Sequence, residues 1–120
     1  MRIVYSEKIP AILGGLVTVS YIKVAPTELI ERLDEKILEA YDLAPQLGGS
    51  VQAFLRVLTT DYRFVHALFH DEEFAVNDLR RAGFTASEVD GYLFSLRQAL
   101  DSGHCFVRYE YELIWKKERP

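Results

Sequence analysis

The sequence predicts an α+β fold, in which a small antiparallel sheet from strands near both ends packs on about five helices. Residues 16–24 and 105–115 are rich in β-branched and aromatic side chains, which is typical of strands. The chain between them shows helical spacing, with capping residues and glycines at intervals. Strands at both ends with helices between them favour this class over an alternating α/β arrangement.

The length of 120 residues predicts a single domain over residues 1–120. The hydrophobic fraction of 49% suits one globular core. Cys105 is the only cysteine, so no intramolecular disulfide can form, which fits a reducing compartment. The first residues lack the pattern of a signal peptide, and the apolar run 11–19 is too short for a membrane span. We therefore expect a cytoplasmic protein without a membrane partner.

The first half of the chain predicts two strands and a helix. Residues 2–9 suit a short strand, and residues 16–24 a second one that pairs antiparallel with residues 105–115. Pro26 suits the first position of a helix. Apolar residues with helical spacing predict its buried face, and they are Leu29, Ile30, Leu33, Ile37, Ala40 and Tyr41.

This predicted helix is strongly acidic in a chain whose net charge is −4. Against Arg32 and Lys36 stand the carboxylates of Glu28, Glu31, Asp34, Glu35, Glu39 and Asp42. A solvated helix face is the ordinary explanation of such a pattern. A docking face for a basic partner, centred on Glu31 and Glu35, is the alternative, and an acidic inhibitor that mimics nucleic acid is another. No basic stripe is present, so we expect no nucleic-acid partner.

A helical unit is predicted over residues 51–101, after a connector at 43–50. It opens with a short helix whose apolar positions are Val51, Phe54, Leu55 and Leu58. Two Asp-x-x-Phe segments, at 61–64 and 71–74, each place an aspartate where it can cap a helix. Thr85 and Glu88 form a capping box, and Gly83 and Gly103 suit helix ends. The last helix, 86–101, has one apolar stripe formed by Val89, Tyr92, Leu93, Leu96, Ala99 and Leu100.

The final strand alternates between apolar and charged residues. One face carries Cys105, Val107, Tyr109, Tyr111, Leu113 and Trp115. The other face carries Arg108, Glu110 and Glu112, so we expect it to be wet.

Metal chemistry has one candidate set. His66 and His70 lie four apart and would share a helix face, and the pair His104-Cys105 could add a ligand. However, a single His-x3-His pair is a weak signal, and Asp71 is needed as a helix cap. We therefore expect no metal and no other cofactor. A small metal-dependent enzyme or metal sensor remains the alternative.

Catalytic motifs are lacking in the sequence. It contains no Gly-rich phosphate loop and no nucleophile elbow. Adjacent strand residues point to opposite faces, so His104 cannot serve directly as a base for Cys105. These observations favour a protein that is not an enzyme.

The outer face of the last helix is the second candidate interaction surface. Phe94 lies off the apolar stripe, beside the small residues Gly91 and Ser95. Packing against the helix near 72–82 is the ordinary explanation. An interface with another chain is the alternative, since an exposed aromatic residue often anchors one.

Residues 51–100 resemble a small helical domain found in the alpha subunit of extradiol ring-cleaving dioxygenases and in leader regions of some enzymatically modified peptides. The residues that carry the resemblance are mostly caps and core positions, and they are Phe54, Leu55, Leu58, Asp61, Phe64, Leu68, Asp71, Glu72, Phe74, Ala75, Gly83, Phe84, Thr85 and Glu88. The resemblance implies a non-catalytic domain held by an enzyme partner. It transfers no catalytic residue.

Taken together, these patterns predict a small non-catalytic interaction module: a subunit, adaptor or inhibitor that acts through protein–protein contacts. Its partner would be another protein, an enzyme being one candidate and a second copy of the chain another.

Overall fold

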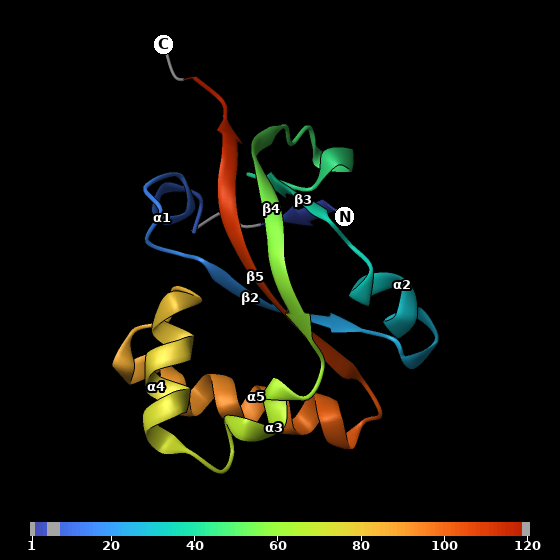
Figure 1. Cartoon of the computed structure of the whole chain (residues 1–120), viewed down its shortest axis with the longest axis vertical. Coiled ribbons are helices and arrows are strands. Elements are labelled where there is room, and N and C mark those ends of the chain that lie inside the picture. The colour runs from blue at the N-terminus through green and yellow to red at the C-terminus, as the bar shows by residue number, and fades with distance from the viewer. Residues whose placement is uncertain (1, 5–7, 119–120) are drawn as a thin grey trace.

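The computed structural model describes residues 2–4 and 8–118, and a five-stranded sheet runs through it (Figure 1). The strand order is β1-β3-β4-β5-β2. β1 runs parallel to β3, and the other neighbouring strands are antiparallel. The strands are β1 (Arg2–Val4), β2 (Val19–Val24), β3 (Ile37–Tyr41), β4 (Val51–Asp61) and β5 (Cys105–Lys116). The α+β class is confirmed, although the strands do not come only from the two ends of the chain.

Five α-helices accompany the sheet within the described residues, and they are α1 (Ile9–Leu13), α2 (Leu29–Leu33), α3 (Phe64–Ala67), α4 (Glu72–Arg81) and α5 (Val89–Asp101). Short 3₁₀ turns lie at Pro26–Glu28, Pro45–Leu47 and Ala86–Glu88. In Figure 1, α3, α4 and α5 lie together on one side of the sheet, whereas α1 and α2 lie apart from them. None of the described helices is long and apolar enough to cross a membrane.

The predicted pairing of the second and last strands is confirmed. β2 pairs with β5 antiparallel, from Val19 opposite Glu110 to Val24 opposite Cys105. The predicted strand at residues 2–9 is only partly present: residues 2–4 join the sheet, residues 5–7 lie outside the described part, and α1 begins at Ile9.

The predicted long helix after Pro26 is wrong. α2 ends at Leu33, and residues 37–41 form β3 between β1 and β4. In β3, Leu38 and Ala40 are buried and their neighbours are not, which is the alternation of a strand. The apolar residues of this segment fit both the spacing of a helix and the alternation of a strand. Pairing with two other strands decides in favour of the strand.

The predicted helix at 51–58 is also wrong, so the helical unit begins at Phe64 and not at Val51. Residues 51–61 form β4, which lies between β3 and β5. Phe54 and Leu55, which the resemblance assigned to a helical domain, lie in this strand. A short apolar run without strong caps is ambiguous between helix and strand, and only its partners resolve it.

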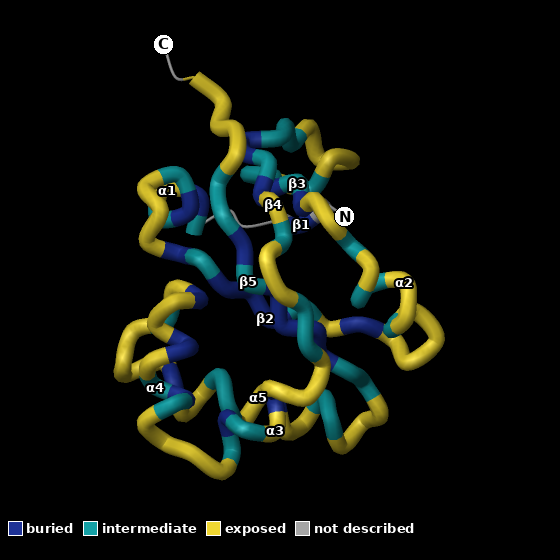
Figure 2. Tube along the Cα trace, viewed as in Figure 1, coloured by how far each residue is buried: buried dark blue, intermediate teal, exposed yellow. Residues whose placement is uncertain are grey.

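Two apolar clusters cover opposite faces of the strands. α3, α4 and α5 enclose one of them with Val19, Tyr21 and Phe106. The other contains Val107 and Tyr109 of β5, and its further members are Ile3, Ile9, Ile12, Val17, Val24, Leu38, Ala40, Ala53, Leu55 and Tyr111. Figure 2 shows buried positions along the middle of β2 and β5 and on the sheet side of α4. The predicted wet face of β5 is therefore partly covered, because Phe106 and Arg108 are both buried.

Local capping signals are confirmed. The carboxylates of Asp61 and Asp71 each accept a hydrogen bond from the backbone N–H of the phenylalanine three residues on, at 3.0 Å in both cases. The rings of Phe64 and Phe74 stack with centroids 5.7 Å apart. The Glu88 carboxylate accepts from the Thr85 amide at 3.0 Å. The hydrogen bonds fix where the helices begin, and the ring stack joins α3 to α4.

Candidate functional site

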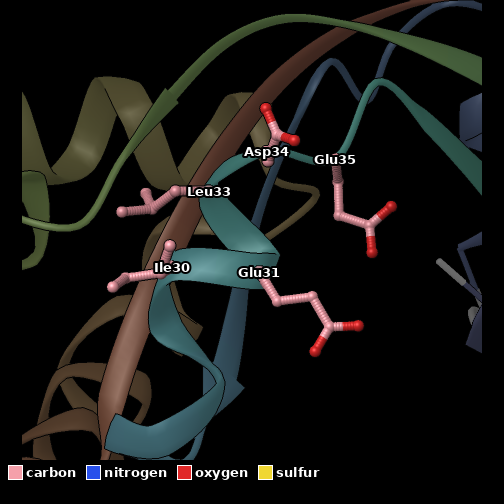
Figure 3. A pocket seen from close by; sticks show the side chains of 5 residues that line it. All are labelled: Ile30, Glu31, Leu33, Asp34 and Glu35. Atoms are coloured by element: carbon pink, nitrogen blue, oxygen red, sulfur yellow. The ribbon is translucent and has the colours of Figure 1, made fainter.

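A shallow pocket at α2 brings apolar and acidic side chains together (Figure 3). It has a volume of about 540 Å³, and its lining residues are Ile30, Glu31, Leu33, Asp34 and Glu35. Figure 3 shows Ile30 and Leu33 pointing to one side of the helix and Glu31 and Glu35 to the other. We call this surface the α2 pocket.

Two hydroxyl groups hold α2 in place although the helix is short. The Tyr109 hydroxyl donates to the carbonyl oxygen of Arg32. The Thr60 hydroxyl donates to the carbonyl oxygen of Leu33 at 3.2 Å. Both bonds satisfy carbonyl groups at the end of the helix, which have no partner within it. Burial is the main cause that raises the pKa of the Tyr109 phenol, so this group stays a donor.

Ile30 does not lie on a buried face, as the helical spacing predicted. Its side chain is 86% exposed, the highest value among the large hydrophobic residues of the described chain. Leu29 and Leu33 instead pack against the core. The helix ends too early for Ile30 to share a stripe with residues further along, so its apolar side chain is left exposed in the α2 pocket, on the same side of the helix as Leu33.

Ion pairs tie up much of the charge around α2. The Arg32 guanidinium lies 3.0 Å from the Glu35 carboxylate and 3.9 Å from that of Glu28. Lys36 lies 3.6 Å from Asp34, with both side chains exposed. Glu31 forms no ion pair with any described residue. Of the two predicted acidic site residues, Glu31 is therefore available to a partner. Glu35 already forms an ion pair with Arg32.

The predicted continuous acidic helix does not exist. Glu39 lies in β3 and Asp42 follows it, so the carboxylates form no regular helical row. The Asp42 carboxylate accepts from the backbone amides of Ser50 and Leu43, at 2.9 and 2.8 Å. The bond from Ser50 is the main cause that lowers the pKa of Asp42. This carboxylate closes a loop, and the geometry gives no support to a nucleic-acid mimic.

The outer face of α5 is open, as the spacing of Phe94 predicts. The Phe94 side chain is 65% exposed. A methyl group added at Gly91 would meet no atom within 4 Å outside its own helix backbone, so α4 does not cover this face. The Ser95 hydroxyl donates to the Gly91 carbonyl at 3.2 Å and does not reach another element.

We expect Phe94→Asp to change the free energy of unfolding by less than about 1 kcal/mol, because the side chain is exposed. If this face also contacts another chain, the substitution weakens that contact. Thermal melting measures the first effect, and sedimentation of the purified protein measures self-association. An unfolded variant would show that Phe94 belongs to the core.

The residues of the predicted metal set surround one pocket, but not in the predicted way. α3 ends at Ala67, so His66 and His70 do not share a continuous helix. Together with His104 and Cys105 they line a pocket of about 520 Å³ between α3, α5 and the start of β5. Within residues 2–4 and 8–118, no three His, Cys, Asp or Glu side chains are arranged to hold one metal ion. We call this cavity the histidine pocket.

A buried ion pair is the feature that the sequence analysis missed. Asp78 of α4 and Arg108 of β5 are 4% and 5% exposed. Arg108 donates from Nε and Nη2 to the two carboxylate oxygens of Asp78, at 2.9 and 2.6 Å. The Tyr21 hydroxyl donates to the same carboxylate. The network joins α4 to β2 and β5.

The electrostatics of this network fit a structural role. Burial, followed by the bond to Asp78, raises the pKa of Tyr21. Burial would raise the pKa of Asp78, but the bonds from Arg108 and Tyr21 and the charge of Arg108 together hold it below its usual range. The carboxylate is thus an ionised acceptor with both oxygens in use, as expected of a structural ion pair.

Comparisons with known proteins identify a shared fold. The sequence matches no family model and no curated protein. Two solved structures resemble it, both mutants of ZmASCH from Zymomonas mobilis. The tyrosine-to-phenylalanine mutant has a TM-score of 0.55 at 15% identity, covering 98% of this chain and 73% of that chain. The serine-to-alanine mutant has a TM-score of 0.57 at 16% identity, covering 98% and 72%.

Proposed function

We propose that this protein is a small non-catalytic interaction module that binds a basic segment of another protein at the α2 pocket. The observation that carries the proposal is the exposure of Ile30 on one side of α2, with a carboxylate that no described residue pairs with, Glu31, on the other side of the same helix. An apolar side chain held in water on a fixed helix favours a partner that covers it.

The chemistry of the pocket defines the partner. Residues 28–36 carry four carboxylates and two basic side chains, so the net charge of this surface is negative and attracts lysine and arginine. Ile30 and Leu33 would contact an apolar side chain of the bound segment, and a basic residue that reaches the other side of α2 would pair with Glu31. A second copy of this chain would bring the same acidic surface, and like charges would oppose that contact at α2.

A library of random displayed peptides, selected on the immobilised protein, tests the proposal. We expect enrichment of peptides that combine lysine or arginine with an apolar residue. Ile30→Asp should abolish the enrichment, and Glu31→Lys should weaken the binding of enriched peptides about tenfold, because it replaces attraction by repulsion. Glu35 is not the residue to change, since its loss would also release Arg32.

The control variant is Glu118→Lys, which makes the same change of charge at an exposed position near the C-terminus. It should bind the enriched peptides as the unchanged protein does. Equal weakening by Glu118→Lys and Glu31→Lys would show a general effect of net charge and contradict a site at α2. Enrichment of acidic or neutral peptides would contradict the proposed partner chemistry.

A further inference from the structure

The histidine pocket is a second cavity, which shares no lining residue with the α2 pocket although Leu29 of α2 lines it. Its volume of about 520 Å³ lies within the range of small-ligand sites, roughly 300–1,000 Å³. Aromatic side chains from β5 and from the segments on either side of α3 form part of its wall, and they are Phe106, Tyr62 and Phe69. A flat ring would find stacking surfaces there.

Basic side chains gather in this pocket although the protein as a whole is acidic. Arg97 and three histidines line it, and Asp101 is the only carboxylate among the lining residues. The Arg97 guanidinium lies over the Phe69 ring, 4.2 Å from its centroid. It forms no ion pair with a carboxylate of the described chain. An arginine that is fixed by stacking and has unused donors is well suited to bind an anionic group.

His104 adds a polar group that no protein atom satisfies. Its Nδ1 is buried and, within the described residues, is the only buried side-chain nitrogen or oxygen without a hydrogen-bond partner. A buried polar atom without a partner is costly unless a bound group or water satisfies it. Nε2 is not buried in this way and bonds to no described residue. His104 therefore offers ring nitrogens that no described protein group uses.

We infer that the histidine pocket binds a small molecule in which a flat ring carries an anionic oxygen group, either a carboxylate or a phosphate. The ring lies against the aromatic wall, and the anionic oxygens accept hydrogen bonds from Arg97 and from the histidine side chains. The donors come from α3 and the turn after it, from α5 and from the residue before β5, and all of them line one cavity, which distinguishes the site from a scattered set of surface charges.

Titration of the full chain with defined probes, followed by NMR signals of the histidine side chains, tests this inference. The probes are phenyl phosphate and benzoate as ring anions, benzamide as the uncharged ring, and inorganic phosphate as the anion without a ring. We expect a ring anion to shift the signals of His66, His70 and His104 saturably. Benzamide and inorganic phosphate should each bind about tenfold more weakly or less, because each lacks one half of the recognition.

Substitution of the arginine localises the effect. Arg97→Gln should weaken the ring anion about tenfold, whereas Arg80→Gln removes the same charge from an exposed position of α4 and should leave binding unchanged. The backbone spectrum of each variant shows whether it is folded, and Arg97→Lys provides a folded substitute if Arg97→Gln is not. The inference is overturned if no ring anion saturates the signals, if inorganic phosphate binds equally well, or if Arg80→Gln has the same effect as Arg97→Gln.

Discussion

Asp78→Asn is expected to lower the free energy of unfolding by about 3 kcal/mol, because it leaves the buried Arg108 with only the more exposed Glu110, 3.4 Å away, as a counter-charge. The two carboxylate oxygens take three hydrogen bonds, two from Arg108 and one from Tyr21. The asparagine side chain keeps one oxygen that can accept. Its NH2 group takes the place of the other oxygen and can only donate. Urea denaturation followed by circular dichroism measures the loss.

An exposed ion pair in the same sheet provides the control. Arg56 of β4 and Glu112 of β5 form a salt bridge with both side chains well exposed. Glu112→Gln should cost at most about 1 kcal/mol, since solvent screens such pairs. A similar small loss in Asp78→Asn would contradict the view that the Asp78–Arg108 pair is desolvated.

A double substitution separates the net contribution of the pair to the free energy of unfolding from the cost of leaving one buried charge unpaired. Replacing both Asp78 and Arg108 by apolar residues of similar size removes the charges together. Such replacements of a buried pair are often neutral, so the double variant should be more stable than Asp78→Asn. If it is less stable, the pair contributes net stability in addition to the penalty for an unpaired charge.

Acid titration provides a second measurement of the same group. The pKa of Asp78 in the folded protein lies below its ordinary value, so the folded state favours the ionised form. The resulting stability is present above the ordinary pKa of about 3.9 and is lost as the pH falls through the lower pKa of the folded state. Asp78→Asn should remove this part of the acid dependence and leave that of the other carboxylates.

One feature of the sequence does indicate the buried pair, namely an aspartate among the apolar positions of a helix. Asp78 lies three residues after Ala75, next to Leu79 and four residues before Ala82, all of which are buried. An aspartate at an apolar position of a helix needs a buried cation or several donors. Reading this position as part of the buried face would have predicted a basic partner, although not which one. Arg108 itself sits among strand residues that alternate, so its burial depends on the helices that cover β5.

Local signals predicted the helices after residue 60 well, because caps and terminal glycines act within a few residues. Asp71 caps α4, and Gly83 and Gly103 follow α4 and α5 with φ angles of 94° and 88°. β3 and β4 depend on strand partners that are distant in sequence. Their apolar residues fit helical spacing as well, so the periodicity alone could not decide.

The candidate site residues, too, could be predicted where their position depends on local sequence and not where it depends on distant contacts. Exposure of Phe94 follows from the period of one helix and was predicted from it. Exposure of Ile30 was not predicted, since the helix was expected to continue beyond Leu33. His66 and His70 were expected to share a face of one helix, whereas they lie in α3 and in the turn after it, and they line a common pocket with His104, which precedes β5. Only the tertiary structure provides that arrangement.

Leu38→Ala should lower the free energy of unfolding by about 2–5 kcal/mol, whereas Ile37→Ala should cost at most about 1 kcal/mol. Leu38 is fully buried in β3, and Ile37 is 38% exposed. A helix through residues 26–41 predicts the reverse, because it places Ile37 on the buried stripe and turns Leu38 away from it by about 100°. Urea denaturation of the two variants therefore distinguishes the strand from the helix. If Ile37→Ala were the more damaging change, the assignment of β3 would be wrong, and the early end of α2 that leaves Ile30 exposed would lose its basis.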